Sequence, residues 1–396
     1  MPAPQPITAL ADSAAPTTRL YAINRRHLDE LTGEHGIFQY AAGKLPDPTR
    51  GHSLDDVARA LRVDILHSRT LGWHAVAESA RRNLRFLEDA FDEPSGRFMS
   101  FRQADGQWVE GLGSNDSLGR AMLALGETIA GAHDARLVER AIVLFGRALK
   151  QAGKVVTPRA QASVILACAA MTQTRVLMAS AEERDATIDT EAAATLRRMA
   201  TGLHARFLDF AQPGWPWPEE ALTFENALLP HALILAGGRI RAETMQRVGL
   251  QILDWLIAAQ TAPEGHLSPV GTGTWVHRGE KAKFDQQPIE ATALILAAEA
   301  AYTATGDPRY AAAMEQAYAW FLGANDLKRQ VARPARGASS DGLTATGASP
   351  NESAEATLMW LMASEHMRLF RGQPVRARVA TPGRRSTAPA LAPTPV

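Results

Sequence analysis

The sequence predicts an all-α protein built as a closed ring of six helical hairpins. A periodicity of about 3.6 residues indicates twelve helical segments along the 396 residues. Small apolar segments begin near residues 54, 114, 157, 223, 285 and 351, and amphipathic segments begin near residues 18, 74, 134, 184, 240 and 308. Helices that are apolar all round must be buried and amphipathic helices must cover them, so we expect six inner and six outer helices.

In the N-terminal half, the first amphipathic helix is expected over residues 18–31. An inner helix follows, with Ser53 as its N-cap and Asp56 at the spacing of a capping box. Alternating apolar residues around Asp105-Gly106 indicate a short β-hairpin. The other helices of this half are expected over residues 74–90, 114–132, 134–151, 157–171 and 182–210.

The C-terminal half repeats the alternation of apolar and amphipathic helices. The loop over residues 212–220 cannot be helical because it contains three prolines, and the Gly-rich segment 261–283 indicates a second hairpin. Segments 1–17 and 371–396 are Pro- and Ala-rich, so we expect disorder on both sides of a toroidal domain over residues 18–370. Helices are expected over residues 223–235, 241–260, 285–305, 308–322 and 351–370.

Composition excludes several classes of function. The chain has 42 Lys and Arg and 42 Asp and Glu, so no overall charge favours nucleic acid or an anionic membrane. Cys168 is the only cysteine, which fits a reducing, cytoplasmic compartment, and neither a secretory signal nor an apolar run long enough to span a bilayer is present. Motifs for a metal, a nucleotide or another cofactor are also missing, so we expect none.

Polar residues recur where the inner helices begin. In a ring of hairpins all inner helices run in the same direction, so their N-termini meet on one rim. The loops before them then lie over the same face and carry Trp108, Trp215, Trp217 and Trp275. The polar clusters expected to converge there are Asp55/Asp56, Asn115/Asp116, Glu225/Asn226, Asp285/Glu290 and Asn351/Glu352/Glu355.

Five carboxylates of this rim are candidates for acid–base catalysis, and each also has a structural interpretation. Asp56 and Asp285 occupy positions where a carboxylate caps a helix and interacts favourably with its dipole. Glu225, Glu290 and Glu355 lie inside apolar helices, where a buried carboxylate requires a partner.

Candidates for binding a substrate are tryptophans and polar rim residues. Trp215 and Trp217 form a Trp-Pro-Trp sequence whose indole faces suit a sugar ring, although the loop could instead plug the core. Asp116 has Arg120 one turn later, so the two either form a structural ion pair or bind substrate. The remaining candidates are Asp55, Asn226, Gln287, Asp341 and Asn351.

Several segments resemble the (α/α)6 toroid of the six-hairpin glycosidases, and in particular a bacterial family of toroid proteins often encoded beside glycosyltransferases. The resemblance covers residues 20–370 and implies a carbohydrate substrate, with a glycosyltransferase as a partner. The chain departs from the family pattern at Val57, Asn115 and Leu118. The segments that carry the resemblance are 51–61, 115–121, 215–219, 223–227, 285–291, 341–343 and 351–357.

Three functions follow from this reading. The first is a glycoside hydrolase-like enzyme that inverts the anomeric centre, with an acid and a base separated by roughly 6.5–9.5 Å. The second is a sugar 2-epimerase, which would use histidines of the inner wall, where the sequence suggests only His231 and His67. The third is a non-catalytic glycan-binding partner of a glycosyltransferase, which the three departures from the family pattern favour.

Overall fold

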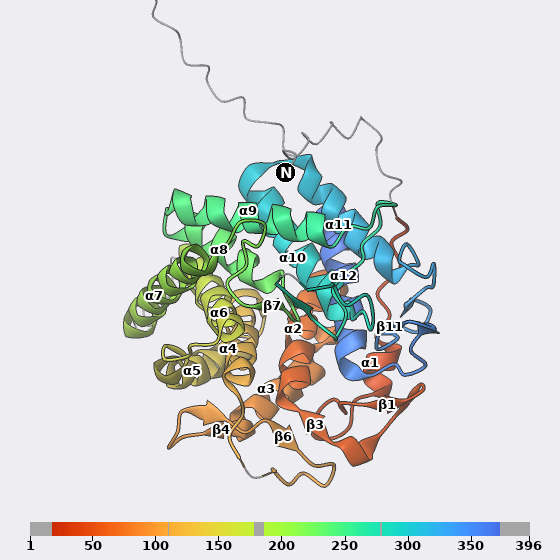
Figure 1. Cartoon of the computed structure of the whole chain (residues 1–396). Helices are drawn as coiled ribbons and strands as arrows, with labels where there is room; N and C mark the ends of the chain where they lie inside the picture. Colours follow the sequence, from red (N-terminus) through yellow and green to blue (C-terminus); the bar gives the residue numbers. More distant parts are fainter. Residues whose placement is uncertain (1–17, 110, 178–185, 278, 373–396) are drawn as a thin grey trace, which may run out of the picture.

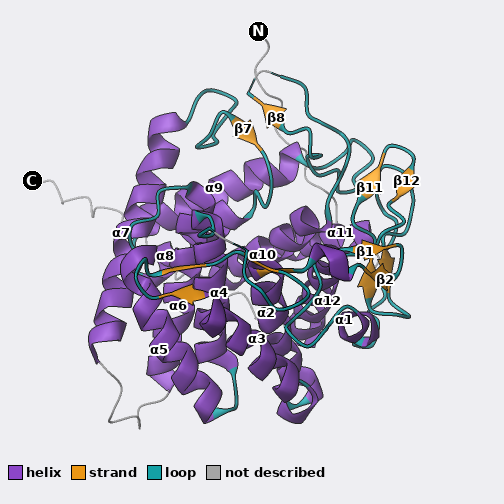
Figure 2. Cartoon of the chain, turned by 90° about the horizontal axis from the view of Figure 1, so that it is seen from below, coloured by secondary structure: helices purple, strands orange, loops and turns teal. Residues whose placement is uncertain are grey.

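A computed structural model of the chain describes residues 18–109, 111–177, 186–277 and 279–372, and it has the predicted (α/α)6 toroid fold (Figures 1 and 2). Each inner helix contacts the next around the ring, and the last contacts the first, so the ring is closed. The inner helices are α2 (Leu54–Leu71), α4 (Asn115–Gly131), α6 (Pro158–Leu177), α8 (Leu228–Arg239), α10 (Pro288–Thr305) and α12 (Ala354–Gly372).

The outer helices cover the inner ring and lie around the edge of the molecule in Figure 1. Each packs on the inner helix of its own hairpin, and α1 closes the ring by packing on α12. They are α1 (Arg26–Glu30), α3 (Ala77–Ala90), α5 (Ala135–Ala152), α7 (Ala186–Phe210), α9 (Glu243–Ala259) and α11 (Pro308–Phe321).

The first outer helix is shorter than predicted, because residues 18–25 are not helical. Side chains of α12 satisfy backbone carbonyls in this segment: Arg371 donates to Thr18 O at 2.6 Å, and Arg368 donates to Tyr21 O. These tertiary hydrogen bonds take the place of helical ones. Arg371 therefore belongs to α12, which runs through Gly372, and not to the predicted tail; residues 1–17 and 373–396 lie outside the described residues.

The strands are two-residue antiparallel pairs in the connecting loops (Figure 2). The hairpin predicted around Asp105-Gly106 is confirmed by a bridge between Arg102 and Trp108. The hairpin predicted within 261–283 is confirmed in part, by an antiparallel bridge between Thr261 and Leu267. Trp275–Val276 of the same segment pairs instead with Ala221–Leu222 of a different loop. The pairs are β1 (Ala41–Ala42) with β2 (Leu45–Pro46), β3 (His52–Ser53) with β6 (Phe101–Arg102), β4 (Phe91–Asp92) with β5 (Arg97–Phe98), β7 (Ala221–Leu222) with β8 (Trp275–Val276), β9 (Ala332–Arg333) with β10 (Ala338–Ser339), and β11 (Leu343–Thr344) with β12 (Gly347–Ala348).

Small residues let the inner helices approach one another closely. A Cβ atom added at Gly126 of α4 would lie 2.5 Å from the carbonyl oxygen of Ala167 on α6. Cys168 is buried beside it, and burial raises the pKa of its thiol to about 12. The apolar inner helices therefore form the core that their composition predicts.

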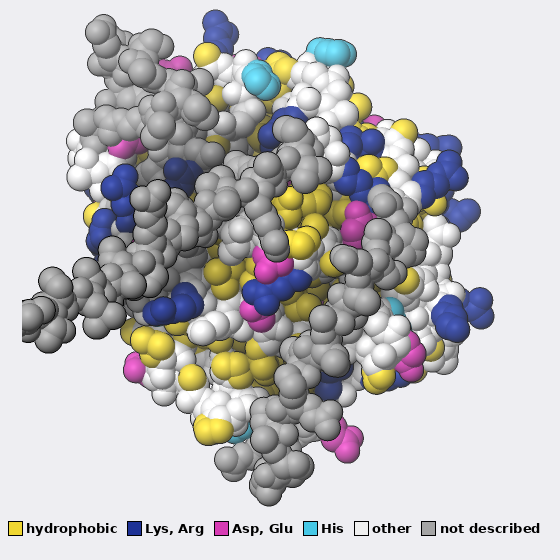
Figure 3. Space-filling view, turned by 90° about the horizontal axis from the view of Figure 1, so that it is seen from above, with side chains coloured by type: hydrophobic (Ala, Val, Ile, Leu, Met, Phe, Trp, Pro, Cys, Tyr) yellow, Lys and Arg dark blue, Asp and Glu magenta, His cyan; other side chains and the backbone are white. Residues whose placement is uncertain are grey.

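The surface carries charges of both signs. Figure 3 shows Lys and Arg side chains interspersed with Asp and Glu side chains around hydrophobic ones on one face, in keeping with a formal net charge of zero. Among the described helices, none combines the length and the hydropathy that crossing a membrane requires.

Candidate functional site

Two arginines gather four carboxylates at the N-terminal ends of the inner helices. Arg59 Nη1 lies 3.1 Å from Asp56 Oδ1 and 2.9 Å from Glu355 Oε2, which joins α2 to α12. Arg120 of α4 lies 2.5 Å from Asp55 Oδ2 and 3.4 Å from Glu225 Oε2. Because the inner helices are parallel, acids that are up to 300 residues apart in sequence meet around these two guanidinium groups.

The ion pair predicted between Asp116 and Arg120 does not form. Arg120 turns toward the neighbouring helix α2 and toward Glu225, and it forms ion pairs with Asp55 and with Glu225. Asp116 instead accepts a hydrogen bond from Thr157 Oγ1 at 3.0 Å. A one-turn spacing permits a pair along a single helix, but the ring brings stronger partners from other helices.

Glu290 lies behind the cluster and holds the loop before α8. Its carboxylate accepts hydrogen bonds from the backbone N–H groups of Glu225 and Asn226 and from Asn226 Nδ2 at 2.9 Å. Glu225 has a φ of +49°, a left-handed conformation that non-glycine residues rarely adopt. Arg159 donates to Phe224 O at 2.6 Å and to Asn226 Oδ1 at 3.3 Å, which fixes the same turn from the other side.

Two adjacent cavities open at this rim, with volumes of about 440 and 250 Å³. Asp55, Arg59, Gln287 and Glu355 line both, so the two form one hollow. The 440 Å³ cavity is also lined by Arg120 and Glu290, and the 250 Å³ cavity by Asp56 and Asp341. A hollow of this size, lined by convergent polar groups, has the form of a small-molecule site.

Burial sets the protonation of two acids in this hollow. It raises the pKa of Asp56 to about 7, with the nearby Glu355 and Asp55 acting in the same direction and Arg59 opposing them. It also raises the pKa of Glu290 to about 7 against the hydrogen bonds from Asn226 and Glu225. Carboxyl groups with pKa values near neutrality can hold a proton at pH 7 and deliver it, as a general acid must.

The raised pKa of Asp56 predicts that Asp56→Asn removes part of the pH dependence of stability. Between about pH 4 and 7 the folded chain keeps the Asp56 proton while the unfolded chain has lost it, so native stability falls as pH rises. Asparagine does not titrate. Between pH 4 and 7 the free energy of unfolding of the variant should therefore rise, relative to that of the native chain, by on the order of 2–4 kcal/mol. Urea unfolding of both proteins at pH 4, 5.5 and 7 measures the difference; a constant difference would contradict the raised pKa.

Other predicted site residues lie outside the hollow or support it. Asp285 is exposed, lines neither rim cavity and does not cap α10, whose N-cap is Gln287. Asn351 Oδ1 accepts from the backbone N–H of Gly43 at 2.9 Å. Asp341, at the edge of the smaller cavity, accepts two hydrogen bonds from Ser353.

Trp215 and Trp217 are buried, with 4% and 0% of their surface exposed, and line neither rim cavity. Trp217 stacks on Trp255 of α9 and contacts Phe207, while the Trp215 ring packs against Trp255 and Trp275. The substrate-stacking role predicted for these indoles is therefore wrong, and the alternative of a loop plug holds. The prolines stiffen a loop whose apolar rings are more stable in the core than in water.

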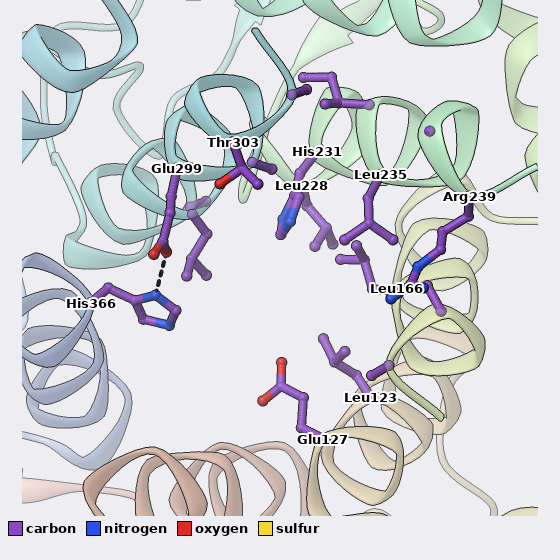
Figure 4. Close-up of a pocket in the computed structure, with 18 of the residues that line it drawn as sticks. Leu123, Glu127, Leu166, Leu228, His231, Leu235, Arg239, Glu299, Thr303 and His366 are labelled. Atoms are coloured by element: carbon purple, nitrogen blue, oxygen red, sulfur yellow. Dashed lines mark hydrogen bonds and ion pairs between the residues drawn. The ribbon is translucent and has the colours of Figure 1, made fainter. Parts of the chain in front are cut away.

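A further cavity of about 500 Å³ lies inside the ring, between the inner helices (Figure 4). His231 of α8 and His366 of α12 both point into it, and His366 Nδ1 lies 2.6 Å from Glu299 Oε2 of α10. Burial lowers the pKa of His231 to about 4, so its ring is neutral at pH 7. His231 lies on the inner wall as predicted, and His366 was not among the predicted histidines. His67, the other predicted histidine, lines neither this cavity nor the rim hollow.

Sequence reasoning also missed Arg59 and Arg159, the cations that organise the rim. Both are buried in inner helices, where a charge is stable only with a partner. Arg59 follows Asp56 at a spacing that allows contact within the helix, and this was the available signal. Among the described residues, no group of three or more His, Cys, Asp or Glu side chains could hold a metal ion.

Comparison with solved structures identifies proteins of the same fold. No protein-family model matches the chain, and no curated protein matches its sequence. A sugar epimerase from a ruminal bacterium is 12% identical with a TM-score of 0.62, and the match covers 88% of this chain and 95% of the epimerase. Cellobiose 2-epimerase from Bacillus thermoamylovorans is 11% identical with a TM-score of 0.63, covering 86% and 95%.

A glycoside hydrolase has the same architecture. An inactive variant of an α-1,6-mannanase from Salegentibacter sp., in complex with α-1,6-mannotetrose, is 12% identical with a TM-score of 0.57, covering 87% of this chain and 96% of the mannanase. Its inactivating changes replace two consecutive aspartates by alanine. At these identities the matches establish the toroid fold, and function has to be argued from the residues.

Proposed function

We propose that the chain is a carbohydrate-active enzyme that hydrolyses glycosidic bonds of an oligo- or polysaccharide with the carboxylates of the rim hollow. The observation that carries this proposal is the convergence of Asp55, Asp56 and Glu355 at the open hollow, around Arg59 and Arg120. Glu225 is joined to this cluster through Arg120 and lines the interior cavity. The mannanase comparison supports the proposal, since that enzyme is inactive when two consecutive aspartates are replaced and this chain has consecutive aspartates at residues 55 and 56.

Asp56 is the proposed general acid. Its raised pKa keeps a proton available for the glycosidic oxygen when the bond to the anomeric carbon breaks. Glu355 is a poor base for this acid because both contact the same Arg59 nitrogen, which leaves little room for a water between them. We therefore assign the base to Glu225, which forms an ion pair with Arg120. Glu225 would take a proton from the water that attacks the anomeric carbon, and this attack would invert the configuration of that carbon.

Glu290 is assigned to positioning rather than to proton transfer. It accepts three hydrogen bonds from the turn that carries Glu225, and its side chain is 4% exposed. Without this carboxylate, the left-handed backbone of Glu225 would lose its buried acceptor. The position of Glu225 therefore depends on Glu290.

Glu290→Gln tests this assignment. An amide supplies one acceptor oxygen where the carboxylate supplies two, so we expect about 1–3 kcal/mol of lost stability together with a large loss of turnover. As a control, Glu290→Asp keeps the charge and should recover part of both. Turnover unchanged in Glu290→Gln, with the fold intact by circular dichroism, would remove Glu290 from the mechanism.

A sugar 2-epimerase is the second candidate, because two histidines line the interior cavity. Neutral His231 and the Glu299-paired His366 could serve as the base and acid of proton exchange. The two epimerases of the same fold support this candidate. We rank it second because aliphatic side chains such as Leu123, Leu166 and Leu235 form much of the wall, and they offer no hydrogen bonds to sugar hydroxyls.

One panel of glycans separates the candidates. The purified chain is incubated with α-1,6-mannotetraose, cellobiose and a broad set of oligosaccharides, and products are followed by chromatography and by NMR of the anomeric protons. Shorter chains released with inverted configuration support hydrolysis at the rim. A glucose unit converted to mannose without chain cleavage supports the epimerase. Calorimetric binding without any product would instead favour a non-catalytic glycan-binding partner of a glycosyltransferase.

A further inference from the structure

The interior cavity differs in chemistry from the rim hollow. Its walls are formed largely by Leu, Ile and Ala side chains of four inner helices, including Leu123 of α4, Leu166 of α6, Leu235 of α8 and Leu296 of α10. The rim hollow, in contrast, is surrounded by acids and arginines. An aliphatic wall of this kind favours an apolar ligand, because burying such a ligand removes apolar surface from water without stranding polar groups.

The charged side chains of this cavity are paired, with one exception. Arg62 makes a two-point contact with Glu127, with both distances 2.9 Å, and His366 pairs with Glu299. Arg239, on the last turn of α8, forms no hydrogen bond or ion pair with any described residue. Partial burial lowers the pKa of Arg239. A guanidinium still remains protonated at neutral pH, so the side chain carries its positive charge.

Arg239 also marks the entrance. Arg239 and the neighbouring Gly238 line the cavity and are exposed to solvent. Figure 4 shows the Arg239 side chain extending from α8 beside Leu166. These residues lie at the C-terminal end of α8, whereas the rim hollow lies at the N-terminal ends of the inner helices. The interior cavity therefore has its own route to solvent.

We propose that the interior cavity binds an apolar molecule with one anionic head group, the head group contacting Arg239 and the apolar body lying among the leucines. A volume of about 500 Å³ suits a body of two aromatic rings or a medium-length acyl chain. A single negative charge matches the single unpaired guanidinium. Glu225, the proposed base, lines this cavity as well as contacting Arg120 of the rim. The binding proposal rests on Arg239 and the leucines, so it stands whether or not the chain hydrolyses glycosides.

The probe that tests this site is 8-anilinonaphthalene-1-sulfonate, a two-ring apolar body with one sulfonate whose fluorescence rises in apolar surroundings. We expect saturable binding to one site on the folded chain. Arg239→Ala should weaken it about ten-fold, since a charge-assisted interaction is lost, and Arg239→Lys should largely restore it. Ala300→Phe, which places a ring inside the cavity, should abolish binding at unchanged near-ultraviolet circular dichroism.

Two controls separate this site from nonspecific adsorption. Arg247→Ala removes an exposed guanidinium of α9 outside the cavity and should leave the affinity unchanged. The uncharged probe N-phenyl-1-naphthylamine should bind the native chain more weakly and be insensitive to Arg239→Ala. Equal affinity for the sulfonate in the native chain and in Arg239→Ala would overturn the proposal. Displacement of the probe by cellobiose or mannose would also overturn it, and would assign the cavity to a sugar.

Discussion

Asp56→Asn should lower turnover of a glycan substrate about a thousand-fold, within the range that general acid catalysis contributes. Asparagine has the size of aspartate and can still accept the hydrogen bond from Arg59, but it has no proton to deliver. KM should change little, because the loss falls on the transition state and not on ground-state binding. Steady-state rates on the substrate found in the glycan panel measure both constants.

The control for this variant is Asp209→Asn, an exposed position on α7 away from the rim hollow, which should retain native turnover. Asp285→Asn should do the same, since the structure places Asp285 outside both rim cavities. A native rate in Asp56→Asn, or a large loss in Asp285→Asn, would contradict the assignment of the acid.

Trp217→Ala should lower the free energy of unfolding by about 3–5 kcal/mol, the usual loss when a large buried aromatic is truncated. The Trp217 ring is fully buried and contacts Phe207 and Trp255, so its removal creates a cavity and removes both ring contacts. Glycan binding at the rim should persist at temperatures where the variant is folded. Chemical denaturation and calorimetric titration measure the two effects separately.

Phe210→Ala is the matched control for this loss. Phe210 is 46% exposed at the end of α7, so its truncation should destabilise the chain by less than about 1 kcal/mol. A Trp217→Ala protein as stable as the native chain, but unable to bind glycan, would return the Trp-Pro-Trp loop to the role that its sequence suggests.

Local sequence patterns predicted the helices well. The alternation of apolar and amphipathic segments arises from contacts within one or two helical turns, and it led directly to the ring of hairpins. Ser53 was expected as an N-cap, and its side chain accepts a hydrogen bond from the backbone N–H of Asp55 at 3.2 Å. One exception is the segment 18–25, whose backbone is held by arginines from the far end of the chain. Another is the segment 223–227, which was predicted to be helical but forms the loop before α8, where Glu290 holds the backbone of Glu225.

The candidate site was predicted less completely, because its contacts cross between helices. The sequence located acids near the starts of the inner helices, and the structure brings Asp55, Asp56 and Glu355 to one hollow. The sequence could not show that Arg120 would pair with Glu225 in place of Asp116. The residue type does not determine whether a tryptophan is exposed or buried, so the composition of the Trp-Pro-Trp loop could not predict that its rings would pack in the core.

The sequence by itself determined the fold class, the direction of the inner helices and thus the rim on which their polar termini meet, because helical periodicity depends on neighbours along the chain. Only the tertiary structure decided which acid pairs with which arginine, that Glu290 holds the turn of Glu225, and that His231 and His366 border one interior cavity. Those outcomes depend on distances between side chains of different helices, which packing of the closed ring sets.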